Sequence, residues 1–180
     1  MGVKYYAKLT FVLFLITAVV AGLLGFVNAI TSDRIAQLTE ERTAAAMREV
    51  MPEAETFSEL EYTGEDLLVT GVYSAENASG SVGYVIKVAP VGFGGDIDMV
   101  VGVDLTGKVT GVSIVSMAET SGLGDNAKKD SFRSQYIGKS GTLAVTKDGG
   151  SIDSLTGATV TARAVTDGVN AALNAAKILG

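Results

Sequence analysis

The stretch that decides the fold is Asp96–Val115, with the sequence DIDMVVGVDLTGKVTGVSIV. Apolar β-branched residues recur with a period of two on both sides of Asp104–Gly107, whose sequence DLTG is typical of a tight turn. The pattern therefore predicts two antiparallel strands, Asp96–Val103 and Val109–Val115, joined as a hairpin.

The same period of two occurs earlier in the chain and predicts two further strands, Leu67–Tyr73 and Ser81–Val88. The acidic segment Glu53–Asp66 before them is predicted to be irregular. Three elements are predicted after the hairpin: a short helix at Asp125–Tyr136, a strand at Thr142–Thr146 and a helix at about Val160–Leu179. The sequence therefore predicts an α+β domain, in which helices pack on an antiparallel sheet.

Residues 9–30 form a long apolar run without a charged side chain. At about 1.5 Å per residue, a helix of this length reaches roughly 33 Å, which is enough to cross a hydrocarbon core of about 30 Å. A cleaved signal peptide is the alternative, because Lys4 and Lys8 form a basic start and Val27–Ala29 resembles a cleavage site. The apolar part of a signal peptide is usually about 7–15 residues long, so a retained transmembrane helix is predicted instead.

The charges beside this run predict its orientation. Lys4 and Lys8 lie directly before it in a short tail, whereas the basic residues after it are mixed with acidic ones. The number of basic residues on each side does not by itself decide the orientation. The tail with its two lysines is too short to be a translocated domain, so we expect residues 1–8 in the cytoplasm and residues 31–180 outside it. We expect a single-pass protein of the cell (inner) membrane with four parts: a tail at 1–8, a transmembrane helix at 9–30, a juxtamembrane helix and linker at 31–66, and a domain at 67–180.

The composition excludes several kinds of site. The chain contains no His and no Cys, which excludes a zinc finger, a Cys-ligated iron–sulfur cluster, a disulfide and a Ser-His-Asp triad, and no metal site is predicted. The 14 Lys and Arg are outnumbered by 20 Asp and Glu, and a net charge of −6 argues against nucleic acid as a partner. Any cofactor must be held by carboxylates, hydroxyls, amides or backbone groups.

The segment Asp153–Thr161, DSLTGATVT, leads into the last predicted helix. The first amide groups of a helix have no partner inside it and attract anions, phosphate above all. Gly157 and Ala158 would let the backbone approach a bulky ligand closely. The alternative is that Thr156 or Thr159 only caps the helix. A dinucleotide-binding loop is excluded, because too few residues follow for a βαβ unit.

Thr156–Thr161, TGATVT, resembles the S/T-G-A-T-x-T flavinylation motif of FMN-binding domains. Such domains occur in the G subunit of the Rnf electron-transport complex and in the C subunit of the sodium-translocating NADH:quinone oxidoreductase. The resemblance implies that FMN is bound covalently, through a phosphoester, to the last threonine, Thr161. It also implies that Thr156, Gly157, Ala158 and Thr159 lie around the attachment point.

Two further segments are similar to the same family. Met117–Gly124, MAETSGLG, resembles its H-x-E-T-P-G-L-G stretch, and Gly92–Gly95 resembles its G-[YF]-G-G loop. The chain departs from the family at three positions, where Met117 replaces His, Ser121 replaces Pro, and Asp96 stands where Pro is common. The resemblance implies that the flavin is bordered by Glu119, Thr120, Gly122, Leu123 and Gly94. In the alternative reading, Glu119 is only a turn carboxylate and the glycine run only a flexible loop.

The resemblance implies an electron-carrying flavoprotein component of an Rnf-type, ion-translocating ferredoxin:NAD oxidoreductase, without catalysis of its own. Its partners would be other membrane and iron–sulfur or flavin subunits of the complex. Because no base lies near Thr161 in sequence, a separate flavin transferase is expected to attach the FMN. Two alternatives stay open: a C subunit or free-standing extracytoplasmic flavoprotein of the family, and a membrane-anchored, non-redox anion-binding or scaffold module.

Overall fold

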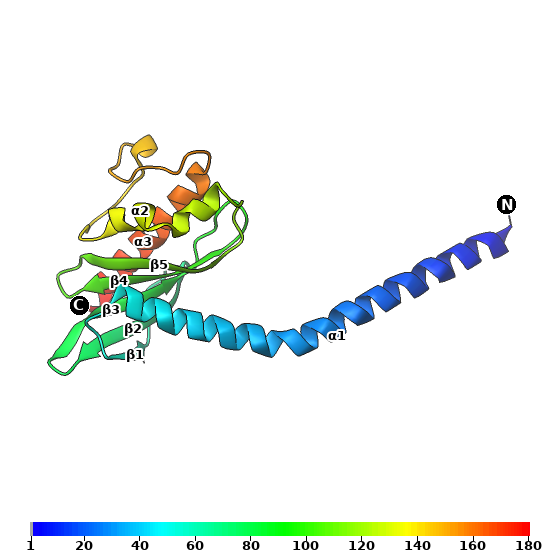
Figure 1. Ribbon diagram of the computed structural model, residues 1–180, viewed down its shortest axis with the longest axis horizontal. Helices are drawn as coiled ribbons and strands as arrows, with labels where there is room; N and C mark the ends of the chain where they lie inside the picture. The colour runs from blue at the N-terminus through cyan, green and yellow to red at the C-terminus, as the bar shows by residue number, and fades with distance from the viewer. Residues whose placement is uncertain (1) are drawn as a thin grey trace. The chain divides into compact units, whose positions relative to one another are not determined.

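Five antiparallel strands form the sheet of the computed structural model, which describes residues 2–180. Each strand pairs with the next one along the chain, so the order across the sheet is β1-β2-β3-β4-β5 (Figure 1). The strands are β1 Thr56–Leu60, β2 Val69–Asn77, β3 Gly80–Val88, β4 Ile97–Asp104 and β5 Val109–Met117. The predicted α+β fold with an antiparallel sheet is confirmed.

Strands β4 and β5 form the hairpin predicted from Asp96–Val115. The N–H of Gly107 donates to the carbonyl of Asp104 at 2.9 Å, and Gly107 has a φ of 77°, which glycine adopts without strain. The carboxylate of Asp104 accepts hydrogen bonds from the N–H groups of Thr106 and Lys108 at 2.8 and 3.0 Å. The turn residues therefore satisfy their own backbone groups, which is why the sequence signal was sufficient here.

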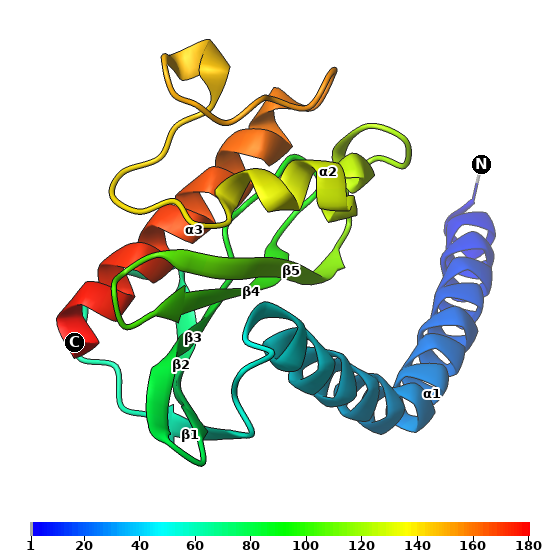
Figure 2. The same ribbon diagram turned by 60° about the vertical axis from the view of Figure 1, so that its left-hand side comes forward.

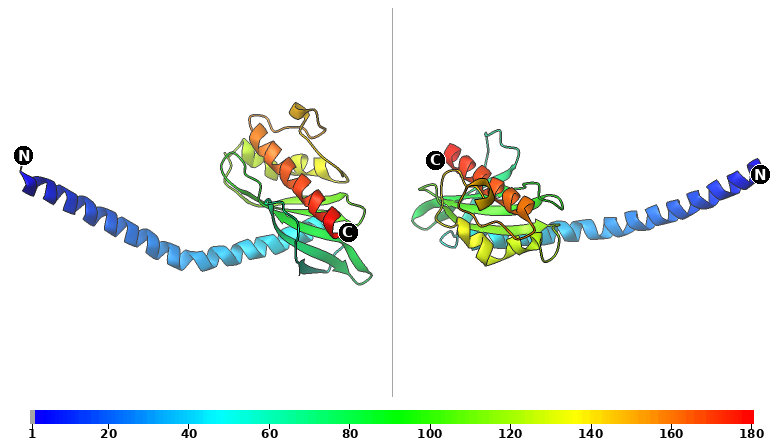
Figure 3. Two further views of the ribbon diagram at one scale, coloured as in Figure 1. Left: turned by 180° about the vertical axis from the view of Figure 1, so that it is seen from behind. Right: turned by 90° about the horizontal axis from the view of Figure 1, so that it is seen from above.

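Helix α3, Thr159–Leu179, lies along one face of the sheet (Figures 2 and 3). Its residues Val165, Val169 and Leu173 are at most 1% exposed and belong to the main core, together with Ile86 and Val101 of the sheet. The final helix predicted at Val160–Leu179 is confirmed, beginning one residue earlier.

The opposite face of the sheet packs against the last turns of helix α1, Val3–Val50. Residues 42–180 form one compact unit, and within it Val50 is fully buried in a second core with Val85 and Val100. A Cβ on Gly111 of β5 would lie only 2.8 Å from the Cα of Val50. Glycine at this position therefore allows the end of α1 to approach the sheet.

The earlier part of α1 carries the predicted transmembrane segment. Within residues 2–180 one helix is long and apolar enough to cross a membrane, judged by its length and composition. Large apolar side chains in this segment are exposed: Phe11, Leu24 and Phe26 are 64%, 67% and 66% exposed. A continuous apolar surface of this kind is what a helix in contact with lipid presents.

Strand β1 corrects the prediction that Glu53–Asp66 is irregular. Thr56–Leu60 pairs with β2, from Thr56 opposite Glu76 to Leu60 opposite Val72. The strand lies at the edge of the sheet, and its run of five residues includes only two large apolar side chains, Phe57 and Leu60. Its hydrogen bonds to β2, rather than a local hydrophobic pattern, hold it in place, so the sequence carried little signal.

The strand predicted at Thr142–Thr146 is wrong. The region forms only an isolated bridge between Val145 and Ile152 and a 3₁₀ turn, η3, Thr146–Asp148. The backbone of Leu143 is bound by a side chain instead: its N–H donates to Oδ1 of Asn170 at 2.8 Å, and its carbonyl accepts from Nδ2 at 2.9 Å. A residue of α3 thus supplies the partners that a neighbouring strand would have provided.

The helix predicted at Asp125–Tyr136 is not continuous. The segment consists of η1 Gly124–Lys128, α2 Asp130–Arg133 and η2 Ser134–Tyr136. Lys129 interrupts it with extended backbone angles, φ −71° and ψ 141°. The apolar side chains still face the core, where Ala127, Phe132 and Tyr136 are buried against α3 and the sheet. Tertiary burial therefore dictates the conformation of this segment more than helical propensity does.

Candidate functional site

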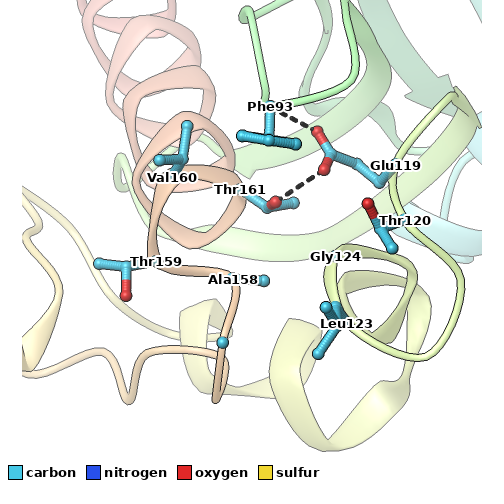
Figure 4. Close-up of a pocket in the computed structure, with 10 residues that line it drawn as sticks. Phe93, Glu119, Thr120, Leu123, Gly124, Ala158, Thr159, Val160 and Thr161 are labelled. Atoms are coloured by element: carbon cyan, nitrogen blue, oxygen red, sulfur yellow. Dashed lines mark hydrogen bonds between the residues drawn. The ribbon is translucent and has the colours of Figure 1, made fainter.

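A cavity of about 430 Å³ lies at the N-terminal end of α3 (Figure 4). Three segments that are distant in sequence form its wall: the loop between β3 and β4, the loop after β5, and the start of α3. The lining residues are Phe93 from the first, Glu119, Thr120, Leu123 and Gly124 from the second, and Gly157, Ala158, Thr159, Val160 and Thr161 from the third.

The start of α3 leaves backbone donors free at this cavity. The residue before the helix is Ala158, and no side chain caps the helix start. The N–H of Ala162 is bonded to the carbonyl of Ala158 at 3.1 Å, so the amides before it have no partner one turn back inside the helix. The reading of Thr156 or Thr159 as a simple helix cap is therefore wrong. The uncapped start carries the partial positive charge that favours an anion.

The side chain of Thr161, the third residue of α3, turns toward the loop after β5. Its Oγ1 donates a hydrogen bond to Oε2 of Glu119 at 2.9 Å, and the residue is 1% exposed (Figure 4). The other carboxylate oxygen of Glu119, Oε1, accepts the N–H groups of Phe93 and Gly94 at 2.7 and 3.2 Å. The carboxylate of Glu119 thus connects all three segments of the cavity wall.

Glycine is required where the loops close around this carboxylate. A Cβ on Gly124 would lie 2.6 Å from Oε2 of Glu119 and 2.9 Å from Oγ1 of Thr161. A Cβ on Gly94 would lie 2.1 Å from the carbonyl oxygen of Ala118. Since no side chain fits at either position, Gly124 lets the backbone approach the two polar groups, and Gly94 lets its loop approach the backbone of the loop after β5.

Two basic side chains lie beside the first turn of α3. The Nζ of Lys147 donates to Oγ1 of Thr159 at 2.6 Å. Arg163 forms a bidentate pair with Asp148, both contacts being 2.6 Å, and the hydrogen bond from Arg163 lowers the pKa of the Asp148 carboxyl. Lys147 therefore adds positive potential to the helix start, whereas the charge of Arg163 is offset by Asp148.

Comparison with known proteins identifies the family. The FMN-binding domain family matches residues 92–174, and the RnfG N-terminal region matches residues 1–50. The G subunit of the Na(+)-translocating ferredoxin:NAD(+) oxidoreductase complex of Acetobacterium woodii is 32% identical, covering 93% of this chain and 89% of the relative. The G subunit of the proton-translocating ferredoxin:NAD(+) oxidoreductase complex of Clostridium ljungdahlii is 37% identical, covering 88% and 85%. This chain belongs to the family of G subunits of ion-translocating ferredoxin:NAD(+) oxidoreductase complexes.

The fold of this G-subunit chain also occurs in a solved structure. The C subunit of the Na(+)-translocating NADH-quinone reductase from Parabacteroides distasonis superposes with a TM-score of 0.60, covering 78% of this chain and 92% of that chain. The two sequences are 17% identical, so the likeness concerns the fold alone.

The residues present at the cavity fit FMN, the ligand of the matched domain family. All the lining residues lie within residues 92–174, the part that matches the FMN-binding domain. The volume of about 430 Å³ falls in the range of roughly 300–1,000 Å³ that is usual for small-molecule pockets. Phe93, Leu123 and Val160 supply apolar walls for a flat ring, and the uncapped start of α3 supplies donors for a phosphate.

Most residues implied by the resemblance lie in this wall, and a few do not. Glu119, Thr120, Leu123, Gly157, Ala158, Thr159 and Thr161 line the cavity. Gly94 is not in the lining but donates its N–H to Glu119, while Thr156 and Gly122 are exposed and outside the lining. Phe93, Gly124 and Val160 also line the cavity, although the resemblance did not imply them as residues that border the flavin. Each of these residues lies within one of the three motifs, and this position is the sequence feature that could have indicated a place in the cavity wall.

The acidic side chains of residues 2–180 are not clustered as metal ligands usually are. No group of three or more acidic side chains is arranged there to hold a metal ion, in a chain that lacks His and Cys. The polar groups of the cavity wall are hydroxyls, one carboxylate and backbone amides. These groups suit a phosphate-bearing organic cofactor.

Proposed function

We propose that FMN is attached through a phosphoester bond to Oγ1 of Thr161, and that the chain carries electrons as the G subunit of an ion-translocating ferredoxin:NAD oxidoreductase complex. One observation carries the proposal. The hydroxyl of Thr161, the last residue of TGATVT, lies in the wall of a ligand-sized cavity at an uncapped helix start. Bound FMN supplies the redox chemistry, and the protein holds and orients it.

We further propose that the FMN-binding domain lies on the extracytoplasmic side of the cell membrane, held by one transmembrane helix. The basic residues Lys4 and Lys8 before the apolar run support this orientation. A covalent bond suits that side, because a flavin lost outside the cytoplasm could not be replaced from the cell's pool. The partners are other membrane, iron–sulfur or flavin subunits of the complex, together with a flavin transferase that makes the bond.

Peptide mass spectrometry tests the attachment point. The full chain, produced together with a flavin transferase, is denatured, digested with trypsin and analysed for a peptide containing Thr161 with FMN added. Thr161→Ala abolishes the flavin fluorescence of the denatured band, whereas Thr161→Ser retains part of it because the hydroxyl remains. Thr156→Ala is the matched control, since Thr156 belongs to the same motif but is exposed and outside the cavity lining. An unmodified Thr161 peptide from a yellow preparation would contradict the proposal.

The alternatives give different results in a simpler test. A non-redox anion-binding or scaffold module, purified and precipitated with acid, leaves a colourless pellet. A covalent flavoprotein keeps its yellow colour and flavin absorbance in the pellet. The C-subunit alternative is supported by the shared motif and by a shared fold at 17% identity, while the G-subunit relatives match nearly the whole chain.

A further inference from the structure

We propose that Glu119 is the proton acceptor for the hydroxyl of Thr161 when FMN is attached, so that the acceptor protein supplies the base for its own modification. The inference rests on the proposed attachment at Thr161. No acidic or basic residue near Thr161 in sequence is suited to this role, but folding brings Oε2 of Glu119 to 2.9 Å from Oγ1 of Thr161. That separation lies within the range of about 2.6–3.2 Å expected between a general base and the proton it removes.

The hydrogen bond of Thr161 is unusual for a helical threonine. Such hydroxyls commonly donate to the carbonyl one turn back, as Thr166 of the same helix does to Ala162 at 2.8 Å. The residue four positions before Thr161 is Gly157, which lies outside α3 and has a φ of 75°. With no carbonyl of its own helix one turn back, the Thr161 hydroxyl donates to Glu119 instead.

The carboxylate is held in place independently of Thr161. Oε1 accepts two backbone N–H groups, from Phe93 and Gly94, which leaves Oε2 directed at the hydroxyl (Figure 4). In the described part of the chain, Glu119 is also the only titratable residue in the cavity lining. The arrangement therefore provides one oriented acceptor at the atom to be modified, and no competing one.

The reaction balances with a donor in which FMN is activated as a pyrophosphate, that is, a flavin dinucleotide. Oγ1 of Thr161 forms a bond to the phosphorus of the flavin half as the pyrophosphate P–O bond breaks. The electron pair of that bond leaves with the nucleoside monophosphate, and the proton of Oγ1 passes to Oε2 of Glu119. No atom is oxidised or reduced. Glu119 supplies the proton acceptor on this chain, while the transferase binds the donor.

The test measures flavin incorporation as a gain in protein mass, not as electron transfer. The full chain in detergent is mixed with purified transferase, Mg²⁺ and flavin dinucleotide, and the rate is followed at increasing transferase concentration. For Glu119→Gln, which keeps the size and loses the basicity, we expect the maximal rate to fall by at least about 100-fold, as is usual on loss of a general base. The transferase concentration at half-maximal rate changes by less than about threefold, because docking is intact.

The matched control is Asp98→Asn. Asp98 also accepts a hydrogen bond from a hydroxyl, that of Ser116 at 2.6 Å, but lies outside the cavity lining. The maximal rate of FMN incorporation into Asp98→Asn is expected to equal that of the parent protein. Thermal unfolding of each unloaded variant shows whether it is folded, and a Glu119→Gln protein that unfolds at the parent temperature while loading slowly supports the proposal.

A second variant keeps the proposal testable if Glu119→Gln is unstable. In Glu119→Ala, added sodium formate should restore part of the maximal rate, whereas sodium chloride at the same ionic strength should not. A parent that fails to gain FMN on Thr161 overturns the proposed function. A parent that loads normally, with Glu119→Gln loading at the same maximal rate, overturns only the role of Glu119.

Discussion

Gly92 lies so close to Glu119 that a Cβ on this glycine would be 2.1 Å from the carboxylate oxygen Oε1. The same oxygen accepts the N–H groups of Phe93 and Gly94. Cδ1 of the buried Ile97 would lie 2.9 Å from the same Cβ, so both atoms that block the added methyl group belong to side chains and not to backbone. A larger residue at position 92 would therefore move the carboxylate aside and away from Thr161.

Gly92→Ala should consequently slow flavin attachment much more than it destabilises the fold. We expect the loading rate to fall at least about tenfold, because a misplacement near 1 Å is enough to disturb a reacting pair. The melting temperature of the unloaded protein should fall to a smaller extent, because the methyl group also meets the buried side chain of Ile97. Gly71→Ala is the control, since its added Cβ makes only ordinary contacts, the nearest at 3.4 Å from Tyr73. A normal loading rate for Gly92→Ala would show that the carboxylate tolerates displacement.

The topology can be tested by labelling, because the chain has no Cys. A single cysteine at Leu67, which is 96% exposed, should react with a membrane-impermeant maleimide in intact cells or spheroplasts. A single cysteine at Gly2, in the predicted cytoplasmic tail, should react only after the membrane is permeabilised. The reverse pattern would place residues 31–180 in the cytoplasm.

Glu119 should also affect the flavin after attachment. At an effective dielectric constant near 20, a unit charge about 6 Å from the ring contributes roughly 3 kcal/mol, before any reduction by solvent. Removing this negative charge makes reduction to an anionic flavin easier, so Glu119→Gln should raise the midpoint potential. Spectroelectrochemistry on protein loaded to completion measures this, with Asp98→Asn as the control. An unchanged potential would place the loop away from the isoalloxazine ring.

Asn170 should contribute to stability through the backbone of Leu143. Asn170→Ala leaves the N–H and carbonyl of Leu143 without the two partners that the side chain provides. Leaving buried polar groups unpaired costs about 1–3 kcal/mol, and we expect the free energy of unfolding to fall by about that amount. Asn174→Ala is the control on the same helix, because Asn174 is exposed. Chemical denaturation measures the free energy of unfolding of both variants. Equal values for Asn170→Ala and Asn174→Ala would show that water replaces the amide of Asn170 as the partner of Leu143.

Patterns local in sequence were enough to predict several elements of this protein. The turn at Asp104–Gly107 carries its own hydrogen bonds, and α3 shows helical spacing along its buried face, so the β4–β5 hairpin and the last helix were predicted. The apolar run at residues 9–30 predicted the membrane-spanning candidate by length alone. The three motifs that meet at the cavity were found through their resemblance to stretches of FMN-binding domains, because each is continuous in the sequence.

The remaining features depend on contacts between residues far apart in the chain. Strand β1 exists because β2 offers it a hydrogen-bonding edge, and the segment at Leu143 has no strand because Asn170 occupies its backbone. The hydrogen bond between Glu119 and Thr161 joins residues 42 positions apart. No local propensity encodes such a pairing, since it requires the sheet and α3 to pack first. The resemblance of the sequence to FMN-binding domains therefore predicted a hydroxyl for the attachment of the cofactor, while only the tertiary structure supplied a candidate for the group that receives its proton.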